Sequence, residues 1–207
     1  MGVRERLAGA LDRRDEAPNV ALAEEIAASG DAEQLAELAG LVRSGTPRER
    51  TDAMKVFYEI GRRRPDLIAP ECPVFLEALR AGSKRELWGA MQALDTVAEH
   101  RADELAAELP AIIAAADRGS VIAKDRCTSI LVKLARAGYA DRVVPILLDR
   151  LSQAAPNQFP SYAESTAEVV RPAEKPRLLA VLRERLAEIT QRARRERIER
   201  VIRKLNG

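Results

Sequence analysis

Residues 82–97, GSKRELWGAMQALDTV, have two close counterparts elsewhere in the chain. One is GTPRERTDAMKVFYEI at residues 45–60, and the other is GSVIAKDRCTSILVKL at residues 119–134. The three stretches each begin with glycine and recur every 37 residues, and a second apolar segment containing a proline follows each of them. A repeat of this length predicts stacked units that bury one face against their neighbours.

The repeated stretches have the pattern of amphipathic helices. Apolar residues recur at spacings of three and four, as at Ala53, Phe57 and Ile60, which places them on one helix face. Thr46 before a proline, and Ser83 three residues before a glutamate, are typical of helix starts. The sequence therefore predicts an all-α fold, a right-handed α-solenoid of stacked antiparallel helical hairpins with a repeat of about 37 residues.

We expect residues 1–207 to form a single α-solenoid domain. Its expected parts are N-terminal cap helices at 1–44, clear repeats at 45–81, 82–118 and 119–155, and a divergent repeat with a basic C-terminal cap at 156–207. Outside the clear repeats, apolar spacing predicts helices near residues 2–13, 18–28, 31–43, 160–171, 176–189 and 191–205.

Composition narrows the class of protein. Apolar residues make up 46%, charged residues 32% and aromatic residues only 3%, a mixture rich in strong helix formers. No apolar run reaches the roughly 18 residues that a membrane helix needs, and the first residues are too charged for a secretory signal. We therefore expect a cytoplasmic protein without a transmembrane segment.

The chain offers little for cofactor chemistry. His100 is the only histidine, which excludes a metal site built on several imidazoles. Cys72 and Cys127 lie far apart in unrelated contexts, as expected of reduced, packed thiols. No nucleophile–base pair, glycine-rich phosphate loop or metal-ligand spacing stands out. We expect no cofactor, and a non-enzymatic role rather than a catalytic one.

Residues 109–135, LPAIIAAADRGSVIAKDRCTSILVKLA, resemble a HEAT repeat of the α-solenoid superfamily. Pro110 matches the proline of the family's first helix, and Asp117 matches the acidic residue before the second. As architecture, the resemblance covers about residues 30–205. HEAT repeats often place a basic residue early in the second helix, and its absence leaves armadillo-like and other helical-repeat families open. In this chain that column holds Thr51, Trp88 and Asp125.

The resemblance implies a scaffold that grips a protein or peptide along a concave surface lined by the second helix of each repeat. With Ala53, Phe57 and Ile60 as core, the opposite helix positions face that surface. Trp88 falls in this exposed column, where its ring would either anchor a partner or fold over the neighbouring repeat and cap the core. The predicted partner-binding residues are Thr51, Lys55, Tyr58, Arg62, Trp88, Gln92, Asp95, Asp125 and Ser129.

A HEAT-like nucleic-acid-binding protein is the alternative, and the family's alkylpurine DNA glycosylases are the enzymes to consider. Excision needs an aromatic pocket and a carboxylate beside a flipped nucleotide, which Trp88 with Asp95 or Asp125 would supply. The predicted nucleic-acid contacts are Arg48, Lys55, Arg62, Lys84 and Arg85. Salt separates the two hypotheses, because phosphate-driven binding weakens steeply as salt rises.

The C-terminal end of the chain is basic. Residues 175–207 hold 11 Lys/Arg against 4 Asp/Glu, whereas the whole chain has a net charge of +2. An Ile/Val/Leu stripe from Ile198 to Leu205 predicts that this end packs as the last helix of the array. Its polar outer face would remain open to acidic partners or membranes.

Overall fold

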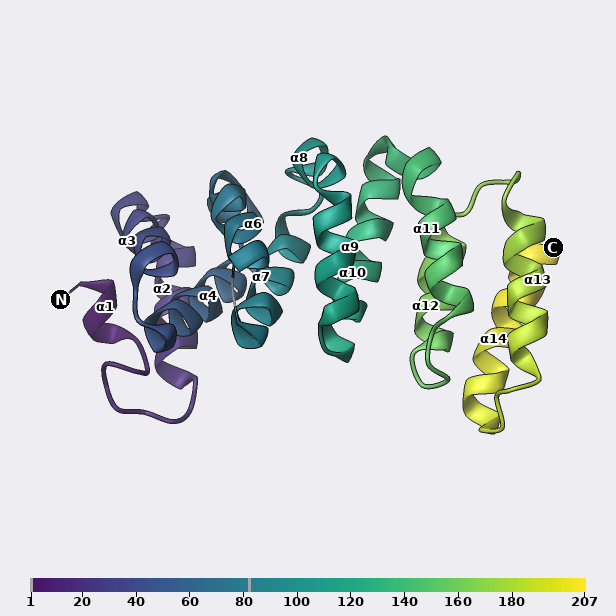
Figure 1. The fold of residues 1–207 in the computed structure, drawn as a ribbon, viewed down its shortest axis with the longest axis horizontal. Helices are drawn as coiled ribbons and strands as arrows, with labels where there is room; N and C mark the ends of the chain where they lie inside the picture. The colour runs from purple at the N-terminus through teal and green to yellow at the C-terminus, as the bar shows by residue number, and fades with distance from the viewer. Residues whose placement is uncertain (1, 82) are drawn as a thin grey trace. The chain divides into compact units, whose positions relative to one another are not determined.

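The computed structural model describes residues 2–81 and 83–207, and every regular element within them is helical. The all-α prediction is therefore confirmed. The chain divides into two compact units, with the boundary between Cys127 and Thr128, and Figure 1 shows the helices of both. None of the helices in the described ranges combines the length and the apolar character that crossing a bilayer requires.

The first unit is built mainly from helix pairs. Its helices are α1 (Val3–Arg6), α2 (Ala17–Ser29), α3 (Ala32–Ser44), α4 (Pro47–Gly61), α5 (Pro65–Ile68), α6 (Cys72–Ala81), α7 (Lys84–Val97), α8 (Ala102–Ala107) and α9 (Leu109–Arg118). A short 3-10 segment, Ala69–Glu71, precedes α6, and α10 (Val121–Leu134) runs across the boundary between the units.

Helix α4 is the centre of the first unit, because it packs against α2, α3 and α7. Its predicted core positions Ala53, Phe57 and Ile60 are fully buried. The Phe57 ring meets Phe75 of α6 edge to face, with ring centroids 5.1 Å apart. Burying one such side chain stabilises the fold by about 1.5–3 kcal/mol. The periodicity of the sequence therefore placed the core of this helix correctly.

Helices α4 and α7 begin at the predicted caps. The Thr46 hydroxyl accepts the Glu49 backbone N–H at 3.3 Å, and the Glu49 carboxylate accepts the Thr46 N–H at 2.7 Å. Ser83 and Glu86 make the same reciprocal pair ahead of α7. Each cap satisfies backbone donors that the helix itself leaves free, which typically stabilises a helix by about 1 kcal/mol.

The prediction of a helix near residues 2–13 is wrong beyond the first turn, since α1 ends at Arg6. Two side chains from later in the chain take the backbone donors that a continuing helix would use. Asn19 accepts the Ala8 N–H and Asp52 accepts the Gly9 N–H, each at 2.8 Å. The segment between α1 and α2 therefore follows an irregular path that long-range hydrogen bonds fix.

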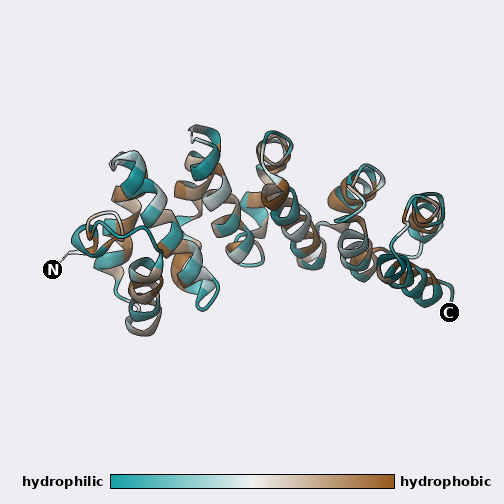
Figure 2. Cartoon of the chain, turned by 90° about the horizontal axis from the view of Figure 1, so that it is seen from below, coloured by the Kyte–Doolittle hydropathy of each residue, from teal (hydrophilic) through white to brown (hydrophobic). Residues whose placement is uncertain are grey.

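The second unit contains the π-helical segment Ala135–Tyr139, α11 (Ala140–Ser152), α12 (Phe159–Val169), α13 (Lys175–Leu186) and α14 (Arg192–Asn206). Its last three helices fall close to the predicted ranges. Leu178, Leu182, Ile198 and Val201 are buried, and α14 packs against α12 and α13, as expected of a terminal helix. Figure 2 shows hydrophilic and hydrophobic stretches on the same helices, which is the amphipathic pattern that the sequence indicated.

Candidate functional site

The face shared by α4 and α7 brings together five of the predicted partner-binding residues, which we call the α4–α7 cluster: Lys55, Tyr58, Arg62, Trp88 and Gln92. Tyr58 and Trp88 meet edge to face, with ring centroids 5.6 Å apart and ring planes at 90°. Lys55 Nζ lies 4.8 Å and the Arg62 guanidinium 5.0 Å from the centre of the Tyr58 ring. One tyrosine ring thus interacts with an aromatic edge and two cations, which fixes its orientation.

Tyr58 itself was expected in an exposed column, and this expectation is wrong, because only 1% of its surface is accessible. Trp88 is half-buried. Its ring partly covers a tyrosine of the preceding repeat stretch, as the capping alternative proposed, and part of it still reaches solvent. The contact with the buried Tyr58 ring makes Trp88 a pre-positioned, partly exposed apolar group on the surface of the first unit.

A carboxylate that sequence reasoning missed organises the cations of the cluster. Glu59 is buried and accepts from Lys55 at 3.0 Å, from Arg62 at 2.6 Å and from Arg63 at 3.1 Å. Burial alone would raise the pKa of Glu59, but Lys55 and Arg63 outweigh burial and lower it. Glu59 therefore stays ionised and holds the cations beside Tyr58.

Lys55 also pairs with a carboxylate from outside the repeats. Its Nζ lies 2.8 Å from Glu16, in the segment that precedes α2. Burial would lower the pKa of Lys55, whereas hydrogen bonds to Glu16 and Glu59 raise it overall. The lysine is thus a fixed, paired cation rather than a proton donor or acceptor near neutral pH.

Two further predicted residues are buried rather than exposed. Gln92 is 5% exposed and its side-chain oxygen accepts from Arg62 at 3.0 Å. Asp95 is also 5% exposed and pairs with Arg126 of α10 at 2.9 Å. The expectation that both face solvent is wrong, because helix α7 is covered on this side by long arginine side chains.

The other predicted residues lie outside the cluster. The Thr51 hydroxyl, on α4, donates to the Pro47 carbonyl at 2.9 Å. Asp125 and Ser129 are half-buried on α10, the helix that crosses the boundary between the two units. Thr51 lies one helical turn before Lys55 on α4, and therefore on the same side of that helix.

A cavity of about 530 Å³ opens beside Thr51, which we call the arginine pocket. The guanidinium-bearing residues that line it are Arg13, Arg14, Arg48 and Arg85, and its other polar walls include Thr51, Ser83, Asp15, Glu16 and Asp52. The pocket therefore joins the irregular segment before α2 to the first turns of α4 and α7. Arg48 and Arg85 are two of the residues predicted as nucleic-acid contacts.

The carboxylates of the arginine pocket are all engaged. Asp15 pairs with Arg13 at 2.8 Å, and this hydrogen-bonded arginine lowers the pKa of Asp15. Asp52 accepts the Gly9 N–H and the Asn19 amide, and Glu16 pairs with Lys55. The negative charge that lines this cavity is thus largely neutralised within the protein.

Two arginines of the arginine pocket, unlike its carboxylates, have no partner among the described residues. Within residues 2–81 and 83–207, the side chains of Arg14 and Arg85 make no ion pair and no hydrogen bond, and both are exposed. Arg48 donates to the Arg13 carbonyl at 2.9 Å and lies 3.9 Å from Asp12. The pocket therefore offers two guanidinium groups with unused donors.

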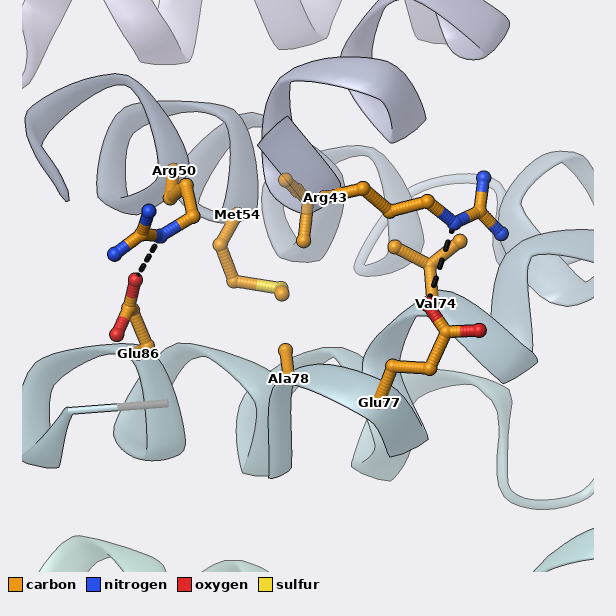
Figure 3. A pocket seen from close by; sticks show the side chains of 8 residues that line it. Arg43, Arg50, Met54, Val74, Glu77, Ala78 and Glu86 are labelled. Carbon is orange, nitrogen blue, oxygen red and sulfur yellow. Dashed lines mark hydrogen bonds and ion pairs between the residues drawn. The ribbon is translucent and has the colours of Figure 1, made fainter. Parts of the chain in front are cut away.

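A second cavity of about 480 Å³ lies among α3, α4, α6 and α7 (Figure 3). Val42, Met54, Val74 and Ala78 give it apolar walls. Figure 3 shows an arginine–glutamate pair on either side, Arg43 with Glu77 and Arg50 with Glu86. Because Glu86 also caps α7, the charges around this cavity are already used to hold the two repeat stretches together.

The positions of Trp88 and Asp95 do not favour base excision. Base excision needs an open aromatic pocket next to a carboxylate. Trp88 instead packs on Tyr58, and Asp95 is buried against Arg126. In the described part of the chain, no group of three or more His, Cys, Asp or Glu side chains is placed to hold a metal ion.

Comparison with known proteins assigns no family: no protein-family model matches the chain, and no curated protein matches it significantly.

Proposed function

We propose that the protein is a non-enzymatic interaction module that binds a protein or peptide partner on the α4–α7 face. The observation that carries this proposal is the Tyr58–Trp88 pair, in which a buried tyrosine holds a partly exposed tryptophan in one orientation. Large amphipathic rings that are already ordered give much contact area for little loss of entropy on binding. Arg62 beside them, with a side chain 47% exposed, adds a polar rim to the apolar anchor.

We infer that the whole chain is a right-handed, HEAT-like α-solenoid with a repeat of about 37 residues. The repeated stretches and the packing of α4 against α7 support this inference. A compact globule of this length would have a radius of gyration of roughly 17 Å. Small-angle X-ray scattering should give a clearly larger value and an elongated particle, and a value at the compact limit would contradict the solenoid.

Affinity capture from the lysate of the cells that make the protein tests the proposed function. The bait variants are Trp88→Ala and, as a matched control, Ile122→Ala, which removes another large apolar side chain that is 41% exposed. Truncating a tryptophan at the centre of an interface typically costs about 2 kcal/mol or more, a loss of affinity of about thirtyfold.

Proteins retained by the wild type and by Ile122→Ala should therefore be missing from the Trp88→Ala capture. Thermal melting followed by circular dichroism establishes that both variants are folded. The same set of captured proteins with all three baits would contradict a partner site at Trp88.

Nucleic-acid binding is the second candidate, and one observation favours it. Of the five predicted contacts, Lys84 and Arg85 at the start of α7 make no ion pair within the described residues. Lys55 and Arg62, by contrast, are paired with Glu59. Fluorescence anisotropy with duplex DNA at low and moderate salt should show tight, steeply salt-dependent binding if this candidate is right.

A further inference from the structure

We propose that the arginine pocket binds a carboxylate of an acidic peptide segment in the partner, with Arg14 and Arg85 as the receiving cations. This inference rests on the proposed function and names the partner's chemistry at the same face. The charges inside the cavity are unbalanced: its carboxylates have partners in the protein, whereas these two guanidinium groups have none among the residues that the structure describes.

The free arginines limit the number of negative charges that the pocket can take. Guanidinium groups bind carboxylates through two parallel hydrogen bonds, and such charge-assisted bonds are the stronger ones. Two free guanidinium groups suit one or two carboxylates.

The charges around the pocket favour a peptide over a polynucleotide as its ligand. A nucleic-acid strand carries one charge at every phosphate, so a strand entering the pocket must also pass the surrounding surface. Near the pocket, the cations Arg13, Arg48 and Lys55 are already paired with Asp15, Asp12 and Glu16. Among the described residues that line the pocket, the two unpaired guanidinium groups therefore match the one or two carboxylates of an acidic peptide better than the charge on every phosphate of a strand.

The arginine pocket lies next to the aromatic ring of Trp88 along α7. Arg85 and Trp88 are three residues apart on α7, so their side chains lie on neighbouring parts of one helix face. Thr51 and Lys55 repeat this arrangement on α4. A peptide that places an acidic side chain in the pocket therefore brings an apolar neighbour within reach of Trp88.

Trp88 also provides the measurement, because it is the only tryptophan in the chain. The probe is the peptide acetyl-Glu-Leu-Glu-Leu-amide, and the matched control is acetyl-Gln-Leu-Gln-Leu-amide, which has the same shape without charge. Each is titrated into the full-length protein while the fluorescence of Trp88 is recorded, at low and at physiological salt. We expect the Glu peptide to bind at least about tenfold more tightly than the Gln peptide, with a difference that shrinks as salt rises.

The variants test which arginines are responsible. Arg85→Gln and Arg14→Gln should each remove most of the preference for the Glu peptide. Arg118→Gln, which changes an exposed arginine at the end of α9, should retain it. All three side chains are exposed, so these substitutions should leave the fold intact.

Several results would overturn the inference. Equal affinity for the two peptides, or no response to either, would remove the carboxylate site. A phosphopeptide or a thymidine oligonucleotide that binds through Arg85 while the Glu peptide does not would assign the pocket to a different ligand. If capture still depends on Trp88 in any of these cases, the pocket assignment fails and the proposed function stands.

Discussion

Two glycines make the packing of α4 directly testable. A methyl group added at Gly61 would lie 2.2 Å from the Thr96 hydroxyl oxygen and 2.7 Å from Ile68 Cδ1, distances that require atoms to move. Added at Gly40 of α3, the same methyl group would meet nothing within 4 Å. Gly61→Ala and Gly40→Ala therefore make the same chemical change in a filled space and in an open one.

The expected effects have opposite signs. Overpacking typically destabilises a core by about 1–3 kcal/mol, and the gain in helix propensity from Gly to Ala offsets at most about 1 kcal/mol of it. Because Thr96 Cβ also lies only 2.8 Å away, we expect Gly61→Ala to lower the free energy of unfolding by about 1–2 kcal/mol. Gly40→Ala keeps the propensity gain alone and should raise it by about 0.5–1 kcal/mol.

Urea denaturation measures both values, with Trp88 fluorescence reporting on α7 and far-ultraviolet circular dichroism reporting on the helices as a whole. Agreement between the two signals supports reading the midpoints as stabilities. If Gly61→Ala were as stable as the wild type, α4 and α7 would not approach each other as closely as the structure has them. Loss of stability in Gly40→Ala would contradict the open environment of α3.

Three further predictions concern the same unit. Leu94→Ala empties a fully buried site on α7 and should lower the free energy of unfolding by about 2–5 kcal/mol. Gln92→Ala loses one hydrogen bond and should lower it by about 1 kcal/mol, and urea titration compares the two variants. The folded protein holds the pKa values of Glu59 and Glu86 below their ordinary 4.5. Their stabilising effect is therefore full above pH 4.5 and is lost as the pH falls through the lower folded pKa values, a loss that melting temperatures across this range measure. Burial raises the pKa of the Cys72 thiol to about 11, so a thiol reagent near pH 8 should modify Cys72 only after denaturation.

These predictions have clear contrary outcomes. Equal losses for the two α7 variants would mean that the core register is wrong. A melting temperature that stays constant as the pH falls below 4.5 would show that the two glutamates do not stabilise the folded state. Rapid modification of native Cys72 would show that α6 is more open than its packing indicates.

The sequence was sufficient for the repeat helices α4 and α7 and for their caps, because these depend on nearby residues. Periodicity located Ala53, Phe57 and Ile60 in the core, and the Ser83 cap began α7 where predicted. It was not sufficient for Tyr58, whose burial depends on Trp88 from the next repeat stretch. Opposite positions on a helix wheel are exposed only where no second helix or long side chain covers them.

The arginine pocket could not be predicted for the same reason. Its wall includes Arg13, Arg14 and Glu16 from a segment predicted in part as helix, and that segment is held by Asn19 and Asp52. The run of charges around residues 12–16 was the available signal, but its position depends on hydrogen bonds across more than ten residues. Local pattern carries no information about such contacts.

Site-specific photo-crosslinking tests the partner site most directly. Thr51→benzoylphenylalanine places the reactive group at the wall of the arginine pocket, and the same replacement of Glu33, exposed on α3, is the control. We expect a covalent adduct with the captured partner from position 51 and none from position 33. Adducts of equal yield from both positions, or an adduct from position 33 alone, would contradict binding on the α4–α7 face.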